Sequence, residues 1–206
     1  MAHLRLVRGG GSSFIDDCVE TLLDLGISAV LSPPLPRSAR TPWEAAGFDL
    51  WADLTLLRRT LDRIPPPGHI VLTGDDNDLP EILRIDASAF DEIWQFDSRA
   101  LNEAMAATPA SILHVARNPE GGLAGFAVTG AGQTIAYLQR LAVDPRWQGQ
   151  GIGRSLLRTS ARWAKRAGAR GLMLNTQADN TPAIALYESE GFQLLEEPLV
   201  VLRRAA

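Results

Sequence analysis

The residue types best suited to chemistry lie in a glycine-rich turn, residues 148–153, between an apolar stretch ending at Val143 and a helical stretch starting near Arg154. Backbone N–H groups in such a turn and the unpaired N–H groups of the first helical turn point toward one spot, where they bind an anion. Glycine allows the backbone to approach a ligand closely because it has no side chain to clash. The turn therefore predicts an anion site.

The spacing within this turn excludes two phosphate-binding motifs. A dinucleotide fingerprint needs G-x-G-x-x-G, but Arg154 follows where the third glycine is required. A nucleotide-hydrolase P-loop needs Gly-Lys followed by Ser or Thr, and the only lysine, Lys165, does not follow a glycine. The pattern that fits is Q/R-x-x-G-x-G/A, formed by Gln148, Gly151 and Gly153.

Apolar spacing and turn residues predict the elements that must position the turn. Helices are expected from Asp78, as the cap before Leu79 and Pro80, and over 98–107, 154–167 and 182–190; strands are expected over 70–73, 112–116, 123–129, 135–143, 171–175 and 199–202. The order is a strand, two helices, three strands, then helix, strand, helix and strand. This order predicts a mixed α/β sheet, not an alternating doubly wound one.

Three prolines and a glycine at 65–68 cannot continue a helix or a central strand, so they predict a domain boundary. The expected division is an N-terminal segment 1–64, a Pro-rich linker 65–69 and a larger domain 70–206. Residues 41–59 echo 181–204, and 8–31 echo 148–174, as helix, glycine and strand. The N-terminal segment is interpreted either as a smaller, degenerate half-copy of the larger fold or as a chance likeness. A half-copy has an open sheet edge and would have to pack against the larger domain.

Composition narrows the class of protein. The chain has 206 residues, of which 46% are hydrophobic and 21% charged, which is typical of a globular protein. A net charge of -4 gives no sign of binding to nucleic acid or to an anionic membrane, and no apolar run approaches a membrane span. The single cysteine, Cys18, excludes an internal disulfide and a multi-cysteine metal site, so no metal is expected. We expect a soluble cytoplasmic protein.

A second motif follows the glycine turn at 180–192, with the sequence Asn-Thr-Pro-Ala-Ile-Ala-Leu-Tyr-Glu-Ser-Glu-Gly-Phe. With both motifs in this order, the chain resembles the GNAT superfamily of acyl-CoA-dependent N-acyltransferases over about 70–206, most specifically over 137–192. The second motif is especially similar to that of the ribosomal-protein N-terminal acetyltransferases. The resemblance implies an α/β fold with a mixed, mostly antiparallel sheet flanked by helices, to which the N-terminal segment, if it is a half-copy, adds a smaller α/β half-domain.

The resemblance also implies the residues that bind acetyl-CoA. The pantetheine arm would lie along the backbone of the strand that ends at Val143, and the pyrophosphate would lie in the glycine turn. The cofactor-binding residues implied are Leu141, Ala142, Val143, Gln148, Gly149, Gln150, Gly151, Ile152, Gly153, Arg154 and Asn180. Arg146 is a further candidate for the same phosphates, and Asn180 has an alternative role as a helix cap. Tyr187 matches the general acid of the family, which protonates the leaving thiolate.

The general base is not evident. The ribosomal-protein enzymes use a glutamate where this chain has Asn175, and asparagine cannot accept the proton. This departure argues against a ribosomal-protein substrate and leaves a base elsewhere, a water relay, or an acceptor amine that is already largely neutral. Four carboxylates stand in the helices expected to line the acceptor, although each is more typical of a solvated surface residue than of a base: Asp86, Glu92, Asp97 and Glu103. Gln139 could orient a water, while His114 is expected to be packed.

The predicted function is therefore transfer of an acetyl group from acetyl-CoA to a primary amine, by direct attack in a ternary complex. The acceptor could be a peptide N-terminus, a lysine or a small-molecule amine, and the sequence does not choose between them. The alternative is a regulatory module that binds CoA without turnover. A weaker possibility is that the N-terminal glycine turn, from Arg8 to Gly11, binds a second CoA. The oligomeric state stays open.

Overall fold

The computed structural model describes residues 2–4 and 11–205. Its contacts divide the chain into two compact units. The first unit comprises the chain up to residue 57, with 175–187 and the stretch from 193 onward, and the second comprises 58–174 and 188–192. Strands β4 (Asp49–Thr60) and β9 (Gly171–Gln177) each begin in one unit and end in the other.

The second unit contains the sheet that the sequence predicts. Strands β5 (Val71–Thr73), β6 (Ala110–Arg117), β7 (Leu123–Ala131) and β8 (Ile135–Val143) pair antiparallel in that order, and β9 pairs parallel to β8. All nine residues of β7 are buried, because both faces of the sheet are covered by helices. The predicted mixed and mostly antiparallel sheet is confirmed.

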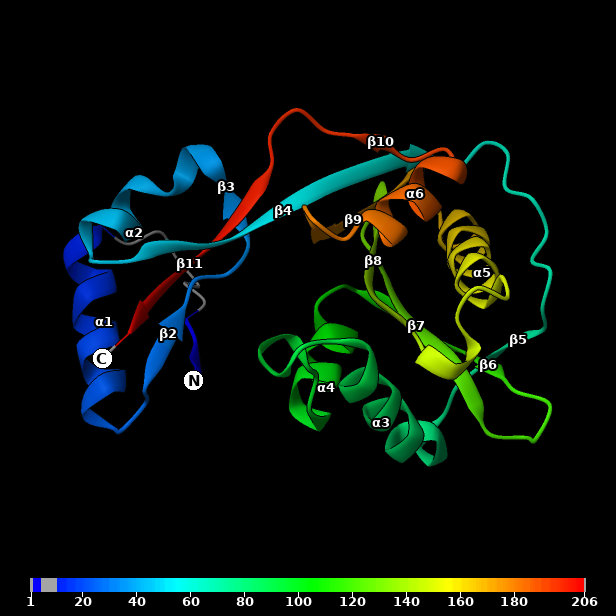
Figure 1. The fold of residues 1–206 in the computed structure, drawn as a ribbon. Coiled ribbons are helices and arrows are strands. Elements are labelled where there is room, and N and C mark those ends of the chain that lie inside the picture. Colours follow the sequence, from blue (N-terminus) through cyan, green and yellow to red (C-terminus); the bar gives the residue numbers. More distant parts are fainter. Residues whose placement is uncertain (1, 5–10, 206) are drawn as a thin grey trace. The chain divides into compact units, whose positions relative to one another are not determined.

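Helices α3 (Leu79–Ala89) and α4 (Ser98–Ala106) cover one face of this sheet, and α5 (Ile152–Arg166) covers the other (Figure 1). Their apolar faces explain why they pack there. Ile82 and Ile85 of α3 and Leu101 of α4 join Phe126 and Val128 of β7 in one buried cluster. The four predicted helices are present, although α5 begins at Ile152, two residues before the predicted start.

The described residues also form four short 3-10 turns, at Arg37–Ala39, Asp76–Asp78, Glu92–Trp94 and Pro145–Trp147. One of them bears on the expectation that Asp78 caps α3: Asp78 is the N-cap residue, but its side chain makes no capping hydrogen bond to the helix. The Asp78 carboxylate instead accepts the N–H of Asp75 at 3.1 Å and pairs with Arg117 at 2.9 Å. Asp78 therefore closes the turn before α3, and its side chain is unavailable to the helix itself.

The first unit is built around the last strand of the chain. Strand β11 (Leu199–Ala205) pairs antiparallel with β2 (Ala29–Leu31), β3 (Leu35–Pro36) and β4, while β1 (Ala2–His3) lies parallel to β2. Helices α1 (Ser12–Asp24) and α2 (Thr41–Ala45) pack on these strands, and α6 (Thr181–Ser189) and β10 (Gln193–Leu194) complete the elements. Trp43 and Phe48 meet edge to face at 5.1 Å in this core.

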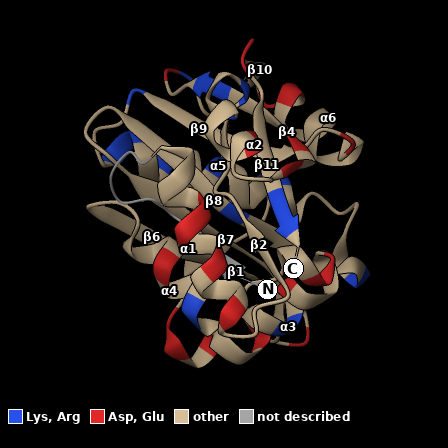
Figure 2. Ribbon diagram, turned by 90° about the vertical axis from the view of Figure 1, so that its left-hand side faces the viewer, with Lys and Arg blue, Asp and Glu red and all other residues tan. Residues whose placement is uncertain are grey.

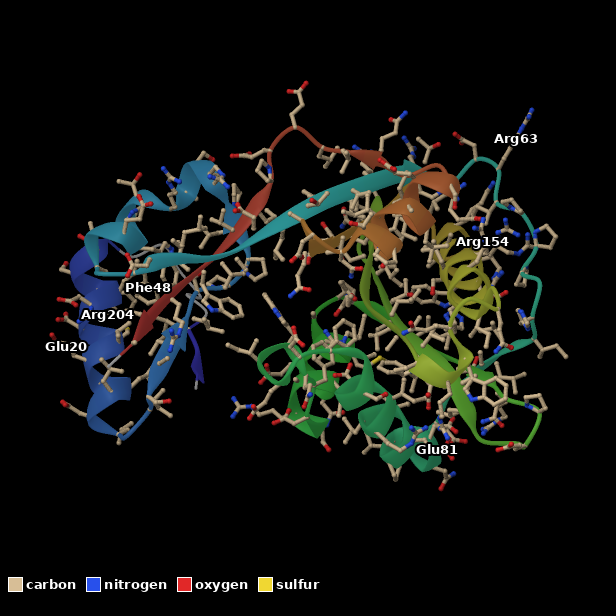
Figure 3. All side chains as sticks on the ribbon, viewed as in Figure 1. Glu20, Phe48, Arg63, Glu81, Arg154 and Arg204 are labelled. Atoms are coloured by element: carbon tan, nitrogen blue, oxygen red, sulfur yellow. The ribbon has the colours of Figure 1, made fainter. Side chains whose placement is uncertain are left out.

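Arg204 joins β11 to α1 in this unit. Its guanidinium pairs with Asp16, donates to the Ala46 carbonyl at 2.8 Å and lies 3.9 Å from Glu20 (Figure 3). The N-terminal core thus takes in residues from the other end of the chain, which a boundary drawn at 65–69 does not anticipate. The division into domains 1–64 and 70–206 stays a prediction.

The helix–glycine–strand pattern that suggested an internal repeat is visible in the elements. Gly26 and Gly47 follow α1 and α2 with φ of 85° and 78°, as Gly168 and Gly191 follow α5 and α6 with φ of 95° and 81°. The interpretation as a degenerate half-copy stays a prediction. Of the second proposed CoA turn, Arg8 to Gly10 lie outside the described residues, and Gly11 precedes α1.

Candidate active site

The strand β8 parts from β9 after three residue pairs. Ile135 to Tyr137 pair with Gly171 to Met173, and no further β8–β9 pair occurs in the described part of the chain. On the other side, β8 stays paired with β7 to its end. From Leu138 onward, one edge of β8 therefore carries backbone groups that β9 does not take up.

The direction of these groups follows from the ladder with β7. The N–H of Asp144 donates to the Ala124 carbonyl at 2.9 Å, and the register then runs without a shift back to Arg140. In an antiparallel ladder successive residues point their backbone groups to alternate sides. Ala142 therefore faces β7, and Leu141 and Val143 point their N–H groups to the parted edge.

A β-bulge interrupts β8 just before this stretch. Arg140 pairs with Val128 and Leu138 with Thr129, so Gln139 is the extra residue. The Nε2 atom of Gln139 is buried and has no hydrogen-bond partner among the described residues. A Cβ added to Gly130 would collide with this atom, so glycine there leaves the carboxamide its space. Gln139 thus keeps an unused donor, and its orienting of a water stays a prediction.

The glycine turn has the backbone that an anion site requires. Gly149 and Gly151 have φ of 75° and 82°, in the left-handed region that favours glycine. Gly151 is the N-cap of α5, so the unpaired N–H groups in the first turn of that helix face the glycine turn. The Nε2 of Gln148 donates to the Val143 carbonyl at 3.1 Å, which ties the turn back to the end of β8. Gln148 therefore holds the turn with its side chain, and Gln150, Ile152 and Gly153 continue it into the helix.

The two arginines considered for the phosphates have carboxylate partners. Arg154 projects from α5 (Figure 3) and donates to Glu190 at 2.7 Å, while its side chain stays 42% exposed. Arg146 is 68% exposed and pairs with Asp144 at 2.7 Å. Hydrogen bonds from Arg146, despite burial, hold the pKa of Asp144 well below its usual range. Both guanidiniums keep enough exposure to reach a phosphate as well.

Glu190 anchors α5 to the segment that follows α6. Its buried carboxylate accepts from Arg158 at 2.8 Å through both oxygens, in addition to Arg154. Burial by itself raises the pKa of Glu190, but the hydrogen bonds and charges of Arg158 and Arg154 outweigh it and lower the pKa overall. Glu190 is therefore an ionised structural partner and not a proton acceptor for catalysis.

Asn180 and Tyr187 belong to the first unit. The Oδ1 of Asn180 accepts the N–H of Ala183 at 3.3 Å, and its Nδ2 donates to Thr176 Oγ1 at 3.1 Å, so Asn180 does cap α6. Tyr187 is buried, and burial raises the pKa of its phenol to about 12. Tyr187 therefore keeps its proton throughout the neutral range, as a general acid must.

Asp86 was one of the base candidates, and the structure gives it a different role. Its fully buried carboxylate binds Arg140 in bidentate fashion at 2.6 and 2.7 Å and accepts the N–H of Phe96 at 2.6 Å. The Arg140 guanidinium lies between the rings of Phe90 and Phe96, at 3.4 and 4.1 Å from their centroids, and donates to the Trp94 carbonyl. The Asp86–Arg140 pair holds the connection between α3 and α4 in place. The Asp86 carboxylate is occupied by these hydrogen bonds and is not free to accept a proton from an acceptor amine.

The other candidates also have structural explanations. Figure 2 shows acidic residues on α3 and α4. Asp97 caps α4 by accepting the Ala100 N–H at 2.7 Å, and the exposed Glu103 pairs with Arg99 at 2.9 Å. Glu92 is exposed in a 3-10 turn. Asn175 is exposed in β9.

His114 is packed, as predicted. It is buried in β6, where burial and the charge of Arg166 lower its pKa to about 4, and its Nδ1 lies 3.5 Å from Ser160 Oγ. Its neutral ring is part of the core. Among the described residues no group of three or more His, Cys, Asp or Glu side chains gathers to hold a metal ion.

Sequence reasoning missed one residue at the glycine turn. His69 donates from Nε2 to the Gln150 carbonyl at 2.8 Å. A lone histidine after a proline run carries no motif, so only the path of the chain could reveal it. The Arg140 clamp was missed for the same reason, because Asp86 and Arg140 lie 54 residues apart in the sequence.

The chain is similar in sequence to known acetyltransferases. The family described as "Acetyltransferase (GNAT) family" matches residues 79–192. The mycothiol acetyltransferase of Saccharomonospora viridis is 32% identical over 148 residues, which are 65% of this chain and 48% of that protein, so the chain spans about half of its length. The [ribosomal protein bS18]-alanine N-acetyltransferase of Escherichia coli K12 is 35% identical over 118 residues, covering 57% of this chain and 76% of that protein.

Solved structures show the same fold. A tandem GNAT protein from the clavulanic acid biosynthesis pathway superposes with a TM-score of 0.71 at 18% identity, over 98% of this chain and 71% of that one. The ribosomal-protein-S18-alanine N-acetyltransferase from Escherichia coli superposes with a TM-score of 0.56 at 26% identity, over 66% of this chain and 92% of that one. No helix within the described ranges is long and apolar enough to cross a membrane.

Replacing Asp86 tests whether it is structural or catalytic. We expect Asp86→Ala to lower the free energy of unfolding by about 3–5 kcal/mol, because it leaves Arg140 buried without its charge partner. Denaturant titration measures this loss. Glu103→Ala, which removes an exposed pair screened by solvent, is the control and should leave the free energy of unfolding nearly unchanged. Unchanged stability in Asp86→Ala would contradict the clamp.

Proposed function

We propose that this chain, which belongs to the acetyltransferase (GNAT) family, transfers an acetyl group from acetyl-CoA to a primary amine. The observation that carries the proposal is the parted edge of β8 leading directly into the glycine turn. The edge offers a row of backbone groups, and the turn offers N–H donors at a helix N-terminus. A pantetheine arm ending in a pyrophosphate needs both, in that order. The cytoplasmic location expected from composition stays a prediction.

The donor would bind largely through the backbone. The amide groups of pantetheine would pair with Leu141 and Val143 as an added strand does. The pyrophosphate would accept hydrogen bonds from the turn at 148–153, and Arg154 would add positive charge beside it. The backbone N–H of Ala142 faces β7 and its side chain is buried in the core, so its contact with the donor stays a prediction. Asn180 is kept as a proposed contact in addition to its role as a cap.

The reaction would be a direct attack. The acceptor nitrogen attacks the thioester carbonyl carbon, and a backbone N–H near Val143 would stabilise the oxyanion of the tetrahedral intermediate. The carbon–sulfur bond then breaks, Tyr187 donates its proton to the leaving thiolate, and the nitrogen loses its proton to water. Tyr187 regains a proton from solvent, so the products are the acetylated amine and CoA.

The chemistry of the site favours an acceptor that is easily deprotonated. The described carboxylates considered as bases are paired, capping or exposed, and Asn175 stands at the family's glutamate position. Without a strong base, the acceptor must reach the site as a neutral amine. An α-amine with a pKa near 8 is neutral far more often at pH 7 than a lysine with a pKa near 10.4. We therefore propose an acceptor amine of low pKa.

Calorimetric titration with acetyl-CoA tests the glycine turn. We expect the wild type to bind and Gly151→Asp to lose binding, because the new carboxylate repels the pyrophosphate. Gly121→Asp is the matched control: Gly121 also has a positive φ, 91° against 82°, but lies in the β6–β7 turn. Both variants bear similar backbone strain, so only the position differs.

The control should bind as the wild type does, with thermal unfolding recorded for all three proteins. Equal loss in both variants would assign the effect to backbone strain. No binding by the wild type at millimolar acetyl-CoA would overturn the proposed function. Binding without release of CoA thiol, across a panel of amines, would favour the regulatory module.

Tyr187→Phe tests the general acid. We expect kcat to fall by about a hundredfold or more with the dissociation constant for acetyl-CoA unchanged, because the phenol acts only on the leaving group. Its pKa of about 12 keeps the phenol protonated below pH 11, so the rate should show no decline from Tyr187 between pH 6 and 10.

The only ionisation in that range should be that of the acceptor, with kcat/KM rising as the amine loses its proton. The midpoint should move with the pKa of the amine across a series of acceptors. A midpoint that stays fixed when the acceptor changes would reveal a base on the enzyme, and an unaltered kcat in Tyr187→Phe would exclude Tyr187 as the acid.

A further inference from the structure

Residues 62–69, called the strap here, lie along α5 within the second unit (Figure 1). Alternate carbonyls of the strap accept from one face of the helix: Asp62 from Lys165 Nζ at 2.8 Å, Ile64 from Arg162 Nη1 at 3.3 Å and Pro66 from Arg158 Nη1 at 3.0 Å. Residue numbers rise along the strap while those of its partners in α5 fall. The strap therefore runs antiparallel to the helix, from the C-terminal end of α5 toward its N-terminus. The proline run is therefore a docked segment with a fixed path.

The strap ends on the glycine turn. The backbone N–H groups of Gly68 and His69 both donate to Ser155 Oγ, at 3.2 and 3.1 Å. The same hydroxyl donates to the Gly151 carbonyl at 3.1 Å. His69 then reaches the Gln150 carbonyl with Nε2 at 2.8 Å. A carbonyl only accepts, so Nε2 carries the hydrogen, and the tautomer is fixed by the contact.

This contact controls the direction of a donor in the proposed anion site. In a trans peptide the carbonyl of one residue and the N–H of the next point in opposite directions. With the Gln150 carbonyl held toward His69, the Gly151 N–H is held away from the strap. Gly151 forms one end of this peptide and has no side chain to limit rotation about its φ, so the backbone alone restrains the peptide weakly. The hydrogen bond from His69 adds a restraint.

We propose that His69 is a positioning residue for the pyrophosphate of the acyl donor, acting by holding the Gln150–Gly151 peptide so that the Gly151 N–H is directed into the anion site. The inference rests on the proposed function, because the anion is that of acetyl-CoA. His69 is exposed and its ring bonds to the turn, so its removal leaves the core intact. The strap thereby makes the phosphate site depend on a segment more than 80 residues earlier in the chain.

The test compares two donors. Acetyl-CoA and acetyl-pantetheine carry the same thioester and pantetheine arm, and only acetyl-CoA carries the pyrophosphate. We expect His69→Ala to raise the dissociation constant of acetyl-CoA by about three- to tenfold, as the loss of one hydrogen bond does, and to leave that of acetyl-pantetheine unchanged. Calorimetry measures both without knowledge of the acceptor.

Two further variants separate positioning from a general structural effect. His69→Gln can donate from its carboxamide to the same carbonyl and should restore most of the affinity. Ile70→Ala alters the next residue, which is 82% exposed, and should change neither constant. Equal weakening of both donors by His69→Ala, or no weakening of acetyl-CoA, would overturn the proposal. Failure of the wild type to bind acetyl-CoA would instead overturn the proposed function, and this inference with it.

Discussion

The parting of β8 from β9 is the constraint on which the rest of this structure depends. Buried backbone N–H and C=O groups must find partners, and where a strand loses its neighbour in mid-sheet those of the freed edge need partners other than that neighbour. Here the loss occurs after Tyr137, while β7 remains paired to the end of β8. The alternation of the ladder then presents Leu141 and Val143 to the parted edge. A ligand with its own amide groups satisfies that edge without any change in the sheet.

Buried carboxylates paired with arginines hold the elements around this edge. Asp86 and Arg140 fix the α3–α4 connection on one face, and Glu190 fixes α5 through Arg154 and Arg158 on the other. Such pairs add little stability over a well-packed apolar core, but the loss of one partner is costly. They therefore specify one arrangement of the helices. The strap likewise fixes the position of the glycine turn, through hydrogen bonds donated by its last residues.

Much of the second unit could be predicted because its signals are local. The apolar run 135–143, the turn at 118–122 and Gly168 after α5 each determine an element within a few residues. Pairings distant in the sequence could not be predicted in this way. The proline run indicated a boundary, yet its carbonyls bind α5, and the N-terminal core contains Val200 and Leu202 from β11. Asp86 and His69 likewise have roles that only their distant partners define.

Amide hydrogen exchange along β8, measured by NMR with and without acetyl-CoA, tests the central claim most directly. The account predicts that the donor slows exchange at Leu141 and Val143 by at least about tenfold, since each gains a hydrogen bond. Ala142 is an internal control, because its N–H faces β7 and is protected in either state. Slowing confined to the two alternate residues would establish that the donor binds as an added strand. Equal slowing at all three residues, or at none while acetyl-CoA is bound, would contradict it.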